Sequence, residues 1–561
     1  MNNVTQQPKY LTLSVLTLAL FSSLSAQAAP VAPDAGQTSR ELQKQPELNA
    51  PKATAPVRVE GEAVAESASD NRVRIVIKTI HISGNTTFAP SELEALVADL
   101  INGEHSLADL DAGAARITAY YRERGYVVAR AYLPMQDIKD GAVEVRVLEG
   151  QVGARRLTNQ SRLSDAQANG YLSDIKPGDA LQAQPVDRAL LLLSDTPGVG
   201  GARATLQPGA SVGTSDLLVE LDPAAPYAAN VEADNYGNRY TGEYRLGATL
   251  ALNSPLKIGD QLTVRALTSN EALIYARLAY QLPVGSGGLK VGGAYSDTNY
   301  TLGKEFASLQ AHGTARSASL YATYPFIRSQ NSNLYGTLTW EQKKLVDRTD
   351  APVSLSDKQV SLYNLGLAGN HRDALGGAGY TSFDAALISG RLNMDAVSLA
   401  TDATTAKSDG NFARLTYNLN RLQRITDADS LSLVVSGQQA SKNLNSSEKF
   451  SLGGASGVRA YPQGEGNGDE GWLANLELRH SFMGNLQAVA FYDAGAVNIN
   501  HTAYSAAANT RNIAGVGVGL NAQYKSLQFK TALAWSTHGG QAQAEPASSN
   551  PRLWVQVGGT F

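Results

Sequence analysis

An arginine in a glycine-rich segment and an aspartate further along the chain are the residues whose types favour joint chemistry. Arg459 lies in Ser451–Pro462, which joins two segments that read as membrane-spanning β-strands. Asp493 stands in the otherwise apolar run Phe491-Tyr492-Asp493, and counting alternate residues of that strand places its carboxylate inward. Because a guanidinium grips a carboxylate with two parallel hydrogen bonds and keeps its charge, the pair predicts an ionic latch inside a barrel. A solvated hairpin arginine and a pore-wall carboxylate are the alternative.

Residues for catalysis or metal binding form no comparable pattern. The seven histidines lack His-Glu-x-x-His spacing, cysteine is absent, and no nucleophile elbow or phosphate-binding loop occurs. The glycine-rich segment 515–519 lacks the strand-turn-helix context of a dinucleotide site and is typical of a barrel strand with small residues on one face. We therefore expect no enzyme activity, no cofactor and no metal.

Net charge and hydropathy limit the possible functions and locations of the chain. Its 561 residues carry a net charge of −4 and only 17% are charged, which argues against nucleic-acid binding. Residues 1–28 have the features of a secretory signal peptide, with Lys9, an apolar core over Tyr10–Leu24 and the small-residue cleavage site Ala26-Gln27-Ala28. No later segment approaches the roughly 20 apolar residues of a spanning helix. The exported chain is therefore either soluble or membrane-embedded as strands.

The segment 29–72 reads as a tether that carries one short helix. It is rich in Ala, Pro, Gln and Glu, and its helical stretch runs from Gln37 to Gln45, where Pro46 breaks it. Arg40, Glu41 and Leu42 lie in this expected helix.

Two units with one α/β pattern follow, at 73–149 and 150–225. Each reads as strand, helix, helix, strand, strand, and two consecutive copies are better evidence of a domain than one. In the first unit we expect an apolar strand ending at Ser83, a helix from the cap Ser106 to Gly125, and strands over Tyr126–Leu133 and Val143–Val147. In the second we expect strands over Val152–Leu157, Ala202–Leu206 and Leu217–Leu221, with helices from Ser164 and over Val186–Leu193.

From 226 to 561 the helical period disappears, and strands of about ten residues alternate with turns. In Asn411–Asn420 the apolar residues Ala413, Leu415, Tyr417 and Leu419 alternate with polar ones, and Leu553–Phe561 alternates likewise. Charged residues confined to one strand face are typical of a barrel in lipid with a wet lumen. At about 21 residues per strand and connection, the segment holds about 16 strands. The predicted fold class is a transmembrane antiparallel β-barrel preceded by two α/β domains.

Several short motifs occur in an order that resembles a known family. They are Asp234-Asn235-Tyr236-Gly237, Tyr240-Thr241-Gly242, Gly259-Asp260-Gln261-Leu262, Tyr324-Pro325-Phe326-Ile327-Arg328-Ser329, Val458-Arg459-Ala460-Tyr461 and Phe491-Tyr492-Asp493-Ala494-Gly495. With them, the mature chain is similar to the outer-membrane transporter of two-partner secretion, the haemolysin-activator and filamentous-haemagglutinin exporter family. The α/β units look like polypeptide-transport-associated (POTRA) domains.

The resemblance implies roles for the latch residues. The loop with Val458, Arg459 and Tyr461 would fold into the lumen, and its guanidinium would pair with Asp493 beside Phe491. One departure is Ala460, because the family's loop motif most often has glycine after the arginine. Since alanine takes positive φ less cheaply than glycine, a loop tip that needs such a backbone would be shaped differently here.

The resemblance also implies a plug and a client-binding surface. The helix with Arg40, Glu41 and Leu42 would sit in the pore on a flexible tether, and a disordered amphipathic leader is the alternative. The exposed edge of a POTRA sheet would accept an unfolded client as an added strand. The candidate surface lies around Arg116 to Leu133, where domain core is the alternative role of the tyrosines, and it comprises Arg116, Tyr120, Arg124, Tyr126 and Arg130.

The implied function is secretion of a cognate large exoprotein, such as an adhesin or cytolysin, across the outer membrane, with the POTRA domains in the periplasm. The implied partners are that exoprotein with its N-terminal secretion domain, outer-membrane lipid, and the barrel-assembly machinery during biogenesis. A barrel-assembly insertase of the same superfamily is the alternative. Two POTRA units, the plug-like leader and the segment 324–329 favour export, while a passive porin does not explain the two units.

Overall fold

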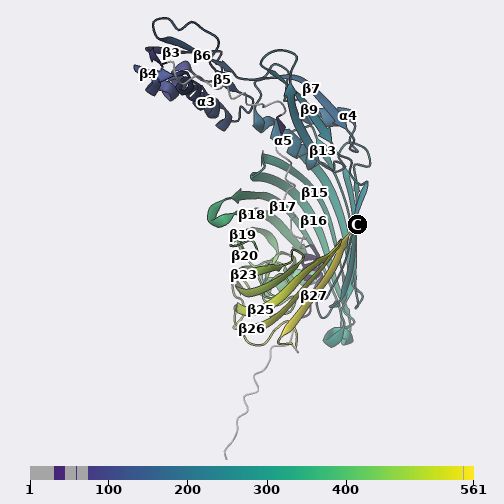
Figure 1. The fold of residues 1–561 in the computed structure, drawn as a ribbon. Helices are drawn as coiled ribbons and strands as arrows, with labels where there is room; N and C mark the ends of the chain where they lie inside the picture. Colours follow the sequence, from purple (N-terminus) through teal and green to yellow (C-terminus); the bar gives the residue numbers. More distant parts are fainter. Residues whose placement is uncertain (1–30, 44–57, 60–73, 547–548) are drawn as a thin grey trace, which may run out of the picture.

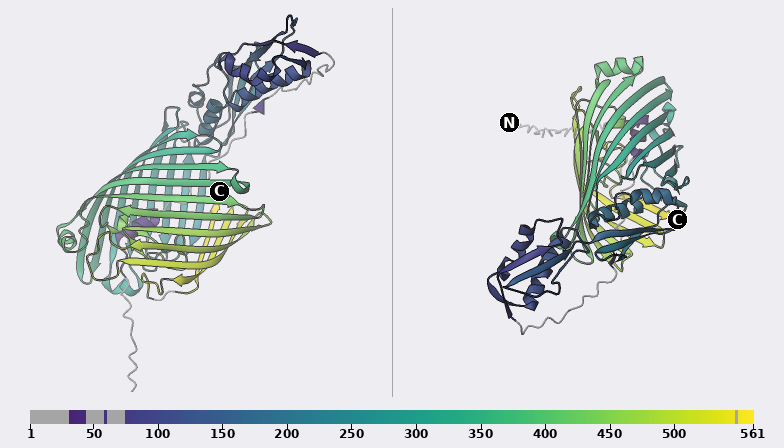
Figure 2. Two further views of the ribbon diagram at one scale, coloured as in Figure 1. Left: turned by 90° about the vertical axis from the view of Figure 1, so that its left-hand side faces the viewer. Right: turned by 90° about the horizontal axis from the view of Figure 1, so that it is seen from above.

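The computed structural model describes residues 31–43, 58–59, 74–546 and 549–561, and the predicted signal peptide lies outside these ranges. The chain forms a closed barrel, two α/β units beyond one end of the barrel, and a short helix within it (Figures 1 and 2). Among the helices in the described ranges, none has the length and apolarity needed to cross a bilayer.

The first α/β unit is built on a three-stranded sheet in the order β3-β6-β5 and a two-stranded sheet of β2 and β4. Helix α3 begins where predicted, because Ser106 and Asp109 form a reciprocal capping box. The predicted strand from Tyr126 was wrong in its first half: the amides of Tyr126 and Ala129 bond back to the carbonyls of Tyr121 and Tyr126, so pairing starts only at Arg130. The elements are β2 (Arg74–Ile77), β3 (Thr79–Ser83), α2 (Pro90–Glu94), η1 (Ala95–Leu100), β4 (Gly103–Ser106), α3 (Leu107–Glu123), β5 (Arg130–Tyr132) and β6 (Ala142–Leu148).

The second unit follows the predicted order closely. Its sheet has the order β1-β8-β9-β7, and the leucine-rich helix α5 packs its apolar face onto it. Strand β1 (Arg58–Val59) comes from the leader and pairs parallel with β8. The remaining elements are β7 (Gln151–Asn159), α4 (Asp165–Tyr171), α5 (Ala183–Ser194), β8 (Ala202–Pro208) and β9 (Thr214–Leu221).

The barrel is closed by antiparallel pairing of 16 strands, which confirms the predicted fold class. Its strands are β10 (Tyr227–Asp234), β11 (Arg245–Asn253), β12 (Gln261–Ser269), β13 (Ile274–Val284), β14 (Leu289–Thr301), β15 (His312–Arg328), β16 (Ser332–Asp350), β17 (Val353–Asp373), β18 (Gly379–Met394), β19 (Gly410–Arg424), β20 (Asp429–Ala440), β23 (Glu470–Phe482), β24 (Leu486–Asn498), β25 (Thr510–Tyr524), β26 (Leu527–His538) and β27 (Arg552–Thr560). The connections contain η2 (Lys304–Leu309), η3 (Leu375–Gly377), α6 (Ala396–Thr404), η4 (Ser446–Glu448), β21 (Phe450–Ser451) and β22 (Asn467–Gly468).

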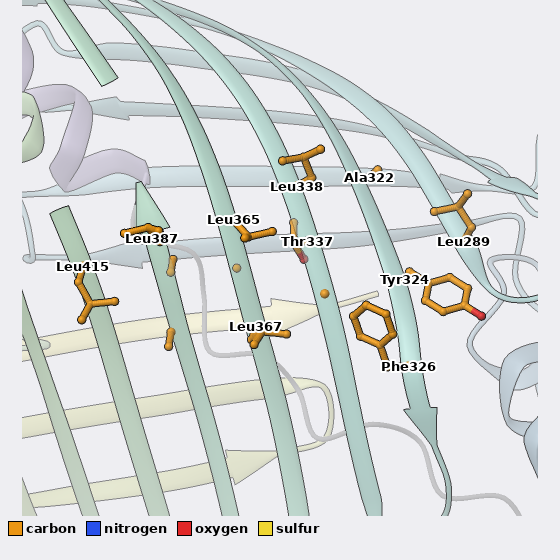
Figure 3. A pocket seen from close by; sticks show the side chains of 14 residues that line it. Leu289, Ala322, Tyr324, Phe326, Thr337, Leu338, Leu365, Leu367, Leu387 and Leu415 are labelled. Atoms are coloured by element: carbon orange, nitrogen blue, oxygen red, sulfur yellow. The ribbon is translucent and has the colours of Figure 1, made fainter. Parts of the chain in front are cut away.

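The two faces of the barrel wall have the predicted polarity. On β19, Leu415 and Leu419 are 41% and 47% exposed on the outside, whereas Arg414 reaches a buried carboxylate in the lumen. Figure 3 shows part of the outer face, an apolar hollow over β14 to β19 lined by leucines and by the rings of Tyr324 and Phe326. An aromatic and aliphatic outer face is what contact with lipid requires.

Candidate functional site

The loop from Leu452 to Gly466 folds on itself before it meets the wall. It leaves β21 and returns through β22, which pair with each other. Within the loop, the Val458 amide donates to the Leu452 carbonyl at 2.7 Å and the Tyr461 amide to the Val458 carbonyl at 3.0 Å. The side chains of Leu452, Val458 and Tyr461 are buried. The loop tip that carries Arg459 is therefore held in one defined conformation by its own hydrogen bonds and buried side chains.

Arg459 makes the predicted contact with Asp493. Its Nε and Nη2 donate to the two carboxylate oxygens at 2.8 and 2.7 Å, and its backbone amide donates to Oδ2 at 3.1 Å. Asp493, on β24, is fully buried. A fork-to-carboxylate geometry with an added amide satisfies a buried charge that would otherwise be costly to desolvate.

Two residues of the neighbouring strand β23 add further polar contacts. Arg459 Nη1 donates to Glu477 Oε1 at 2.6 Å, so the guanidinium lies between two carboxylates. Asn475 faces Asp493 across the β23–β24 ladder, and its amide donates to Asp493 Oδ1 at 2.8 Å and to the Gly457 carbonyl at 2.9 Å. Polar Asn475 and Glu477 alternate with apolar Leu476 and Leu478 in the sequence, which indicates the inward face of β23 but not its contact with this loop.

Aromatic rings enclose the same contact. The guanidinium carbon lies 3.4 Å from the ring centroid of Phe491, a cation–π geometry. The Tyr461 hydroxyl lies 2.8 Å from the carbonyl oxygen of His538 and 2.9 Å from that of Gly540. Trp554, on the last strand, donates its indole N–H to the Arg459 carbonyl at 2.7 Å. Trp554 was missed from the sequence, although its inward position follows from the alternation of β27.

A second ion pair holds the returning limb of the loop. Glu465 has no exposed surface and accepts from Arg511 Nε at 2.8 Å. Its other oxygen accepts the amides of Gln543 and Ala544, each at 2.8 Å. The loop is therefore tied both to the wall at β25 and to the connection between β26 and β27.

Ala460, which stands where the family's loop motif most often has glycine, is accommodated by the barrel wall that it faces. Ala460 does not take a positive φ, so its backbone does not require glycine. Its side chain lies against Gly515, where an added Cβ would come within 2.5 Å of the Ala460 Cβ. The small residues of β25 thus provide the room for the loop tip.

Helix α1 (Ala35–Gln43) lies inside the barrel against η4, β15 and β16 (Figure 2). It begins two residues before the expected start at Gln37, and the expected last residues, 44 and 45, lie outside the described ranges. Arg40 Nη1 donates to the carbonyls of Ser446 and Lys449 at 2.9 and 2.6 Å, and its Nη2 donates to Asn467 at 2.7 Å. Arg40 thus binds both ends of the folded loop's base.

The other two candidate residues of the helix differ in their surroundings. Leu42 is buried among apolar lumen residues such as Tyr240 and Tyr300. Glu41 accepts the side-chain amide of Gln37 at 2.9 Å, within the same helix. Below the helix, buried Glu448 of η4 is paired with Lys343 at 2.9 Å and with Arg414 at 2.8 Å, so the seat of the helix is itself fixed to the wall.

The five client-binding candidates of the first unit do not share one environment. Arg116 and Arg130 are exposed, and Arg116 pairs with Asp99 at 2.9 Å. Arg124 stacks 3.4 Å from the ring centroid of half-buried Tyr120. Tyr126 lies in the core, and its hydroxyl accepts from Gln182 of the second unit at 2.7 Å. Its side chain therefore connects the two units and presents little surface to a client.

Known proteins share this architecture over nearly the whole chain. Residues 213–522 match the family model of the haemolysin secretion/activation proteins ShlB/FhaC/HecB, and residues 75–150 match the POTRA domain of ShlB type. The heme/hemopexin transporter protein HuxB of Haemophilus influenzae (strain 86-028NP) is 29% identical over 528 residues, which cover 92% of this chain and 93% of that protein.

Two further comparisons agree. The hemolysin transporter protein ShlB of Serratia marcescens is 26% identical over 441 residues, covering 76% of this chain and 75% of that protein. The structure of CdiB from Escherichia coli superposes with a TM-score of 0.72 at 19% identity, covering 94% of this chain and 96% of that one, which shows a common fold. Because the family model spans more than half of the sequence, the chain belongs to the haemolysin secretion/activation protein family (ShlB/FhaC/HecB) and is a translocator of the outer membrane with its POTRA region in the periplasm.

Proposed function

We propose that this translocator exports one cognate large exoprotein, in an unfolded state, through the lumen that helix α1 occupies. The observation that carries the proposal is the way α1 is held. It is not a strand of the wall, and the wall closes without it. An α-helix with its side chains is about 10–12 Å wide, so its departure opens a passage wide enough for an extended polypeptide.

The latch of Arg459 and Asp493, with Val458, Tyr461 and Phe491 around it, would fix the loop against the wall while the plug is exchanged for the client. Its contacts support this role because they fix the loop tip to β23, β24 and β27 at once. A loop fixed to the wall leaves the plug as the removable part. We infer that the latch residues act in export and not in chemistry on the client.

Client capture would begin at the first POTRA domain. Exposed Arg116, Arg124 and Arg130 and half-buried Tyr120 form the proposed surface, next to β5 at the edge of its sheet. Edge strands accept an extended peptide through their backbone groups, and flanking side chains select the sequence. Folding of the exported part outside the cell would then bias its diffusion outward.

The name of one extensive relative guides the choice of client. HuxB is called a heme/hemopexin transporter, and its match spans nearly both chains. A haem-acquisition exoprotein is therefore the first client class to test, ahead of the cytolysin suggested by the name of ShlB.

The test is co-expression with a candidate large exported protein that carries an N-terminal secretion domain, followed by assay of the culture medium. We expect the exoprotein in the medium with the translocator and in the periplasm without it. An exoprotein that stays in the periplasm while the barrel shows normal heat-modifiable mobility would contradict the proposal.

One feature favours the alternative function of a barrel-assembly insertase. Strands β10 and β27 close the barrel over five ladder positions, 230–234 with 556–560, and backbone hydrogen bonds between Ala229 and Phe561 and from Asn235 to Val555 extend this seam, whereas β10 and β11 pair over eight positions. A short seam is the natural place for a wall to open sideways. Depletion of the chain would then lower the amounts of other barrel proteins in the outer membrane, whereas a secretion-only translocator leaves them unchanged.

A further inference from the structure

Two arginines of the barrel wall stand opposite each other on neighbouring strands. Arg265 of β12 and Arg277 of β13 are direct partners in the antiparallel register. Both face the lumen, because their sequence neighbours Val264 and Leu278 are 44% and 51% exposed on the outer face and successive residues of a strand point to opposite sides. Like charges in directly opposite positions destabilise a sheet. The pair thus breaks a local rule of strand pairing, as residues at functional sites do.

The two guanidinium groups have one carboxylate between them. Arg265 Nη2 donates to Glu232 Oε1 of β10 at 2.7 Å. The Nε of Arg265 is buried, yet it has no hydrogen-bond partner in the described part of the chain. Across the same described ranges, Arg277 has no ion pair and no hydrogen bond from its side chain. The cluster therefore carries one net positive charge and retains donors for a further oxyanion.

Hydroxyl side chains flank the arginines in the same register row. Thr249 of β11 is opposite Arg265, and Ser296 of β14 is opposite Arg277. The row from β11 to β14 therefore reads Thr, Arg, Arg, Ser on the lumen face. Since a hydroxyl can donate or accept, both flanking residues suit an anionic group that lies between the two guanidinium groups.

We propose that Arg265 and Arg277 form a carboxylate-binding site of the lumen, which holds acidic side chains of the client during its passage. The assignment to the client rests on the proposed function. The Cβ atoms of directly opposed residues lie about 4.5–5.5 Å apart, so both guanidinium groups reach one carboxylate. Their planar forks match that group with parallel hydrogen bonds. A polypeptide carries its negative charge as carboxylates, and Glu232 competes for Arg265, which keeps binding weak enough for release.

The test is block of the open events of the purified full-length protein in a planar bilayer at low ionic strength. Citrate is the small-anion probe, and a tri-glutamate peptide is the polypeptide probe. Arg277→Gln removes a donor without leaving a carboxylate unpaired. Lys530→Gln is the matched control, because Lys530 also faces the lumen, two residues from the strand partner of the inward Trp554. Heat-modifiable mobility shows whether each variant has assembled.

We expect both probes to block the parent, and the half-blocking concentration to rise about tenfold or more in Arg277→Gln, because a charged hydrogen-bond donor is lost. Lys530→Gln should be blocked like the parent. Arg277→Lys, which keeps the charge and loses the fork, should lie between the two and decides the matter if Arg277→Gln does not assemble. Absence of block in the parent, or an equal rise in the Arg277 and Lys530 variants, would overturn the site. Block by citrate but not by tri-glutamate would overturn the assignment to the client.

Secretion by the same variants separates this inference from the proposed function. The initial rate of exoprotein release should fall in Arg277→Gln and stay parental in Lys530→Gln. Parental release in Arg277→Gln would overturn the role in passage. Absence of release by the parent would instead overturn the proposed function, while the block measurements still decide whether the carboxylate site exists.

Discussion

At Arg459, one residue of the loop contacts three strands of the barrel. It bonds Asp493 of β24 and Glu477 of β23, stacks on Phe491, and its carbonyl accepts from Trp554 of β27. Asp493 is fully buried, so its charge depends on this partner. Removal of one partner of such a buried ion pair is strongly destabilising, because the remaining charge stays out of water without a partner.

Arg459→Ala is expected to reduce secretion more than barrel assembly. Loss of one partner of a buried pair costs about 3–5 kcal/mol, and the cost falls on the docked loop and not on the strand ladder. Secreted exoprotein and heat-modifiable mobility measure the two effects separately. Arg479→Ala is the control, since Arg479 bonds Glu477 but not Asp493. Equal loss of secretion and assembly in Arg459→Ala would contradict the latch.

Glu149 of the first POTRA domain makes a pH-dependent contribution to stability. Burial alone would raise the pKa of its carboxyl, but hydrogen bonds from Thr86, Thr87 and the Tyr121 hydroxyl outweigh burial and lower that pKa. A lowered pKa in the folded state gives stability that is present above the unfolded value of about 4.3 and is lost as pH falls through the folded value.

Glu149→Gln should therefore make the first POTRA domain easier to cleave in limited proteolysis of the full-length protein at pH 7. The difference from the parent should shrink as the pH falls below about 4.3, where the carboxylate of the unfolded parent is protonated too. Glu104→Gln, at an exposed carboxylate of the same domain, is the control. A difference that stays constant from pH 7 to pH 3 would rule out this contribution.

Among the elements, the junction between α5 and the strand β15 holds the second α/β unit on the barrel. Arg328, at the end of β15, has a buried side chain that donates to Asp195 just after α5 at 2.6 and 3.0 Å. Arg188 of α5 adds a bond to the Pro325 carbonyl at 2.9 Å. Both barrel residues belong to the motif 324–329 that the sequence singled out, so this motif positions the unit.

Arg328→Ala should loosen this junction without unfolding either part. Spin labels on Val212→Cys in the second unit and Met483→Cys on the barrel rim report the spread of their distance, and both sites are exposed. We expect a narrow distribution in the parent and a broad one in Arg328→Ala. Arg203→Ala, which breaks ion pairs within the second unit only, should leave the distribution narrow. An unchanged width in Arg328→Ala would show that apolar packing alone fixes the unit.

Across the whole molecule, we expect the conductance to depend on whether α1 stays in the barrel. Removal of residues 29–56 should raise the single-channel conductance of the purified protein in a planar bilayer. Arg40→Ala should raise the frequency of open events with a smaller effect, since it removes three hydrogen bonds and leaves Leu42 in place. Gln37→Ala, which loses only a bond within the helix, is the control. Equal conductance with and without residues 29–56 would mean that α1 does not close the pore.

Strand and helix periods by themselves determined most of the architecture. Alternation in Asn411–Asn420 fixed which face meets lipid, because the side-chain period of a strand is two whatever its neighbours are. The Ser106 cap fixed the start of α3 in the same local way. The inward position of Asp493 also followed from counting along one strand, and its partner Arg459 was implied by the family resemblance.

Only the tertiary structure decided which distant residues share a site. Glu477 and Trp554 meet Arg459 because barrel closure brings β23 and β27 to one place, and no local pattern encodes that meeting. Tyr126 left the candidate surface because its hydroxyl meets Gln182 of the next unit. The pairing of β1 with β8 had no signal in the sequence either, since two residues in a polar leader have no period. Local periods depend on the backbone alone, whereas these contacts depend on how distant segments pack.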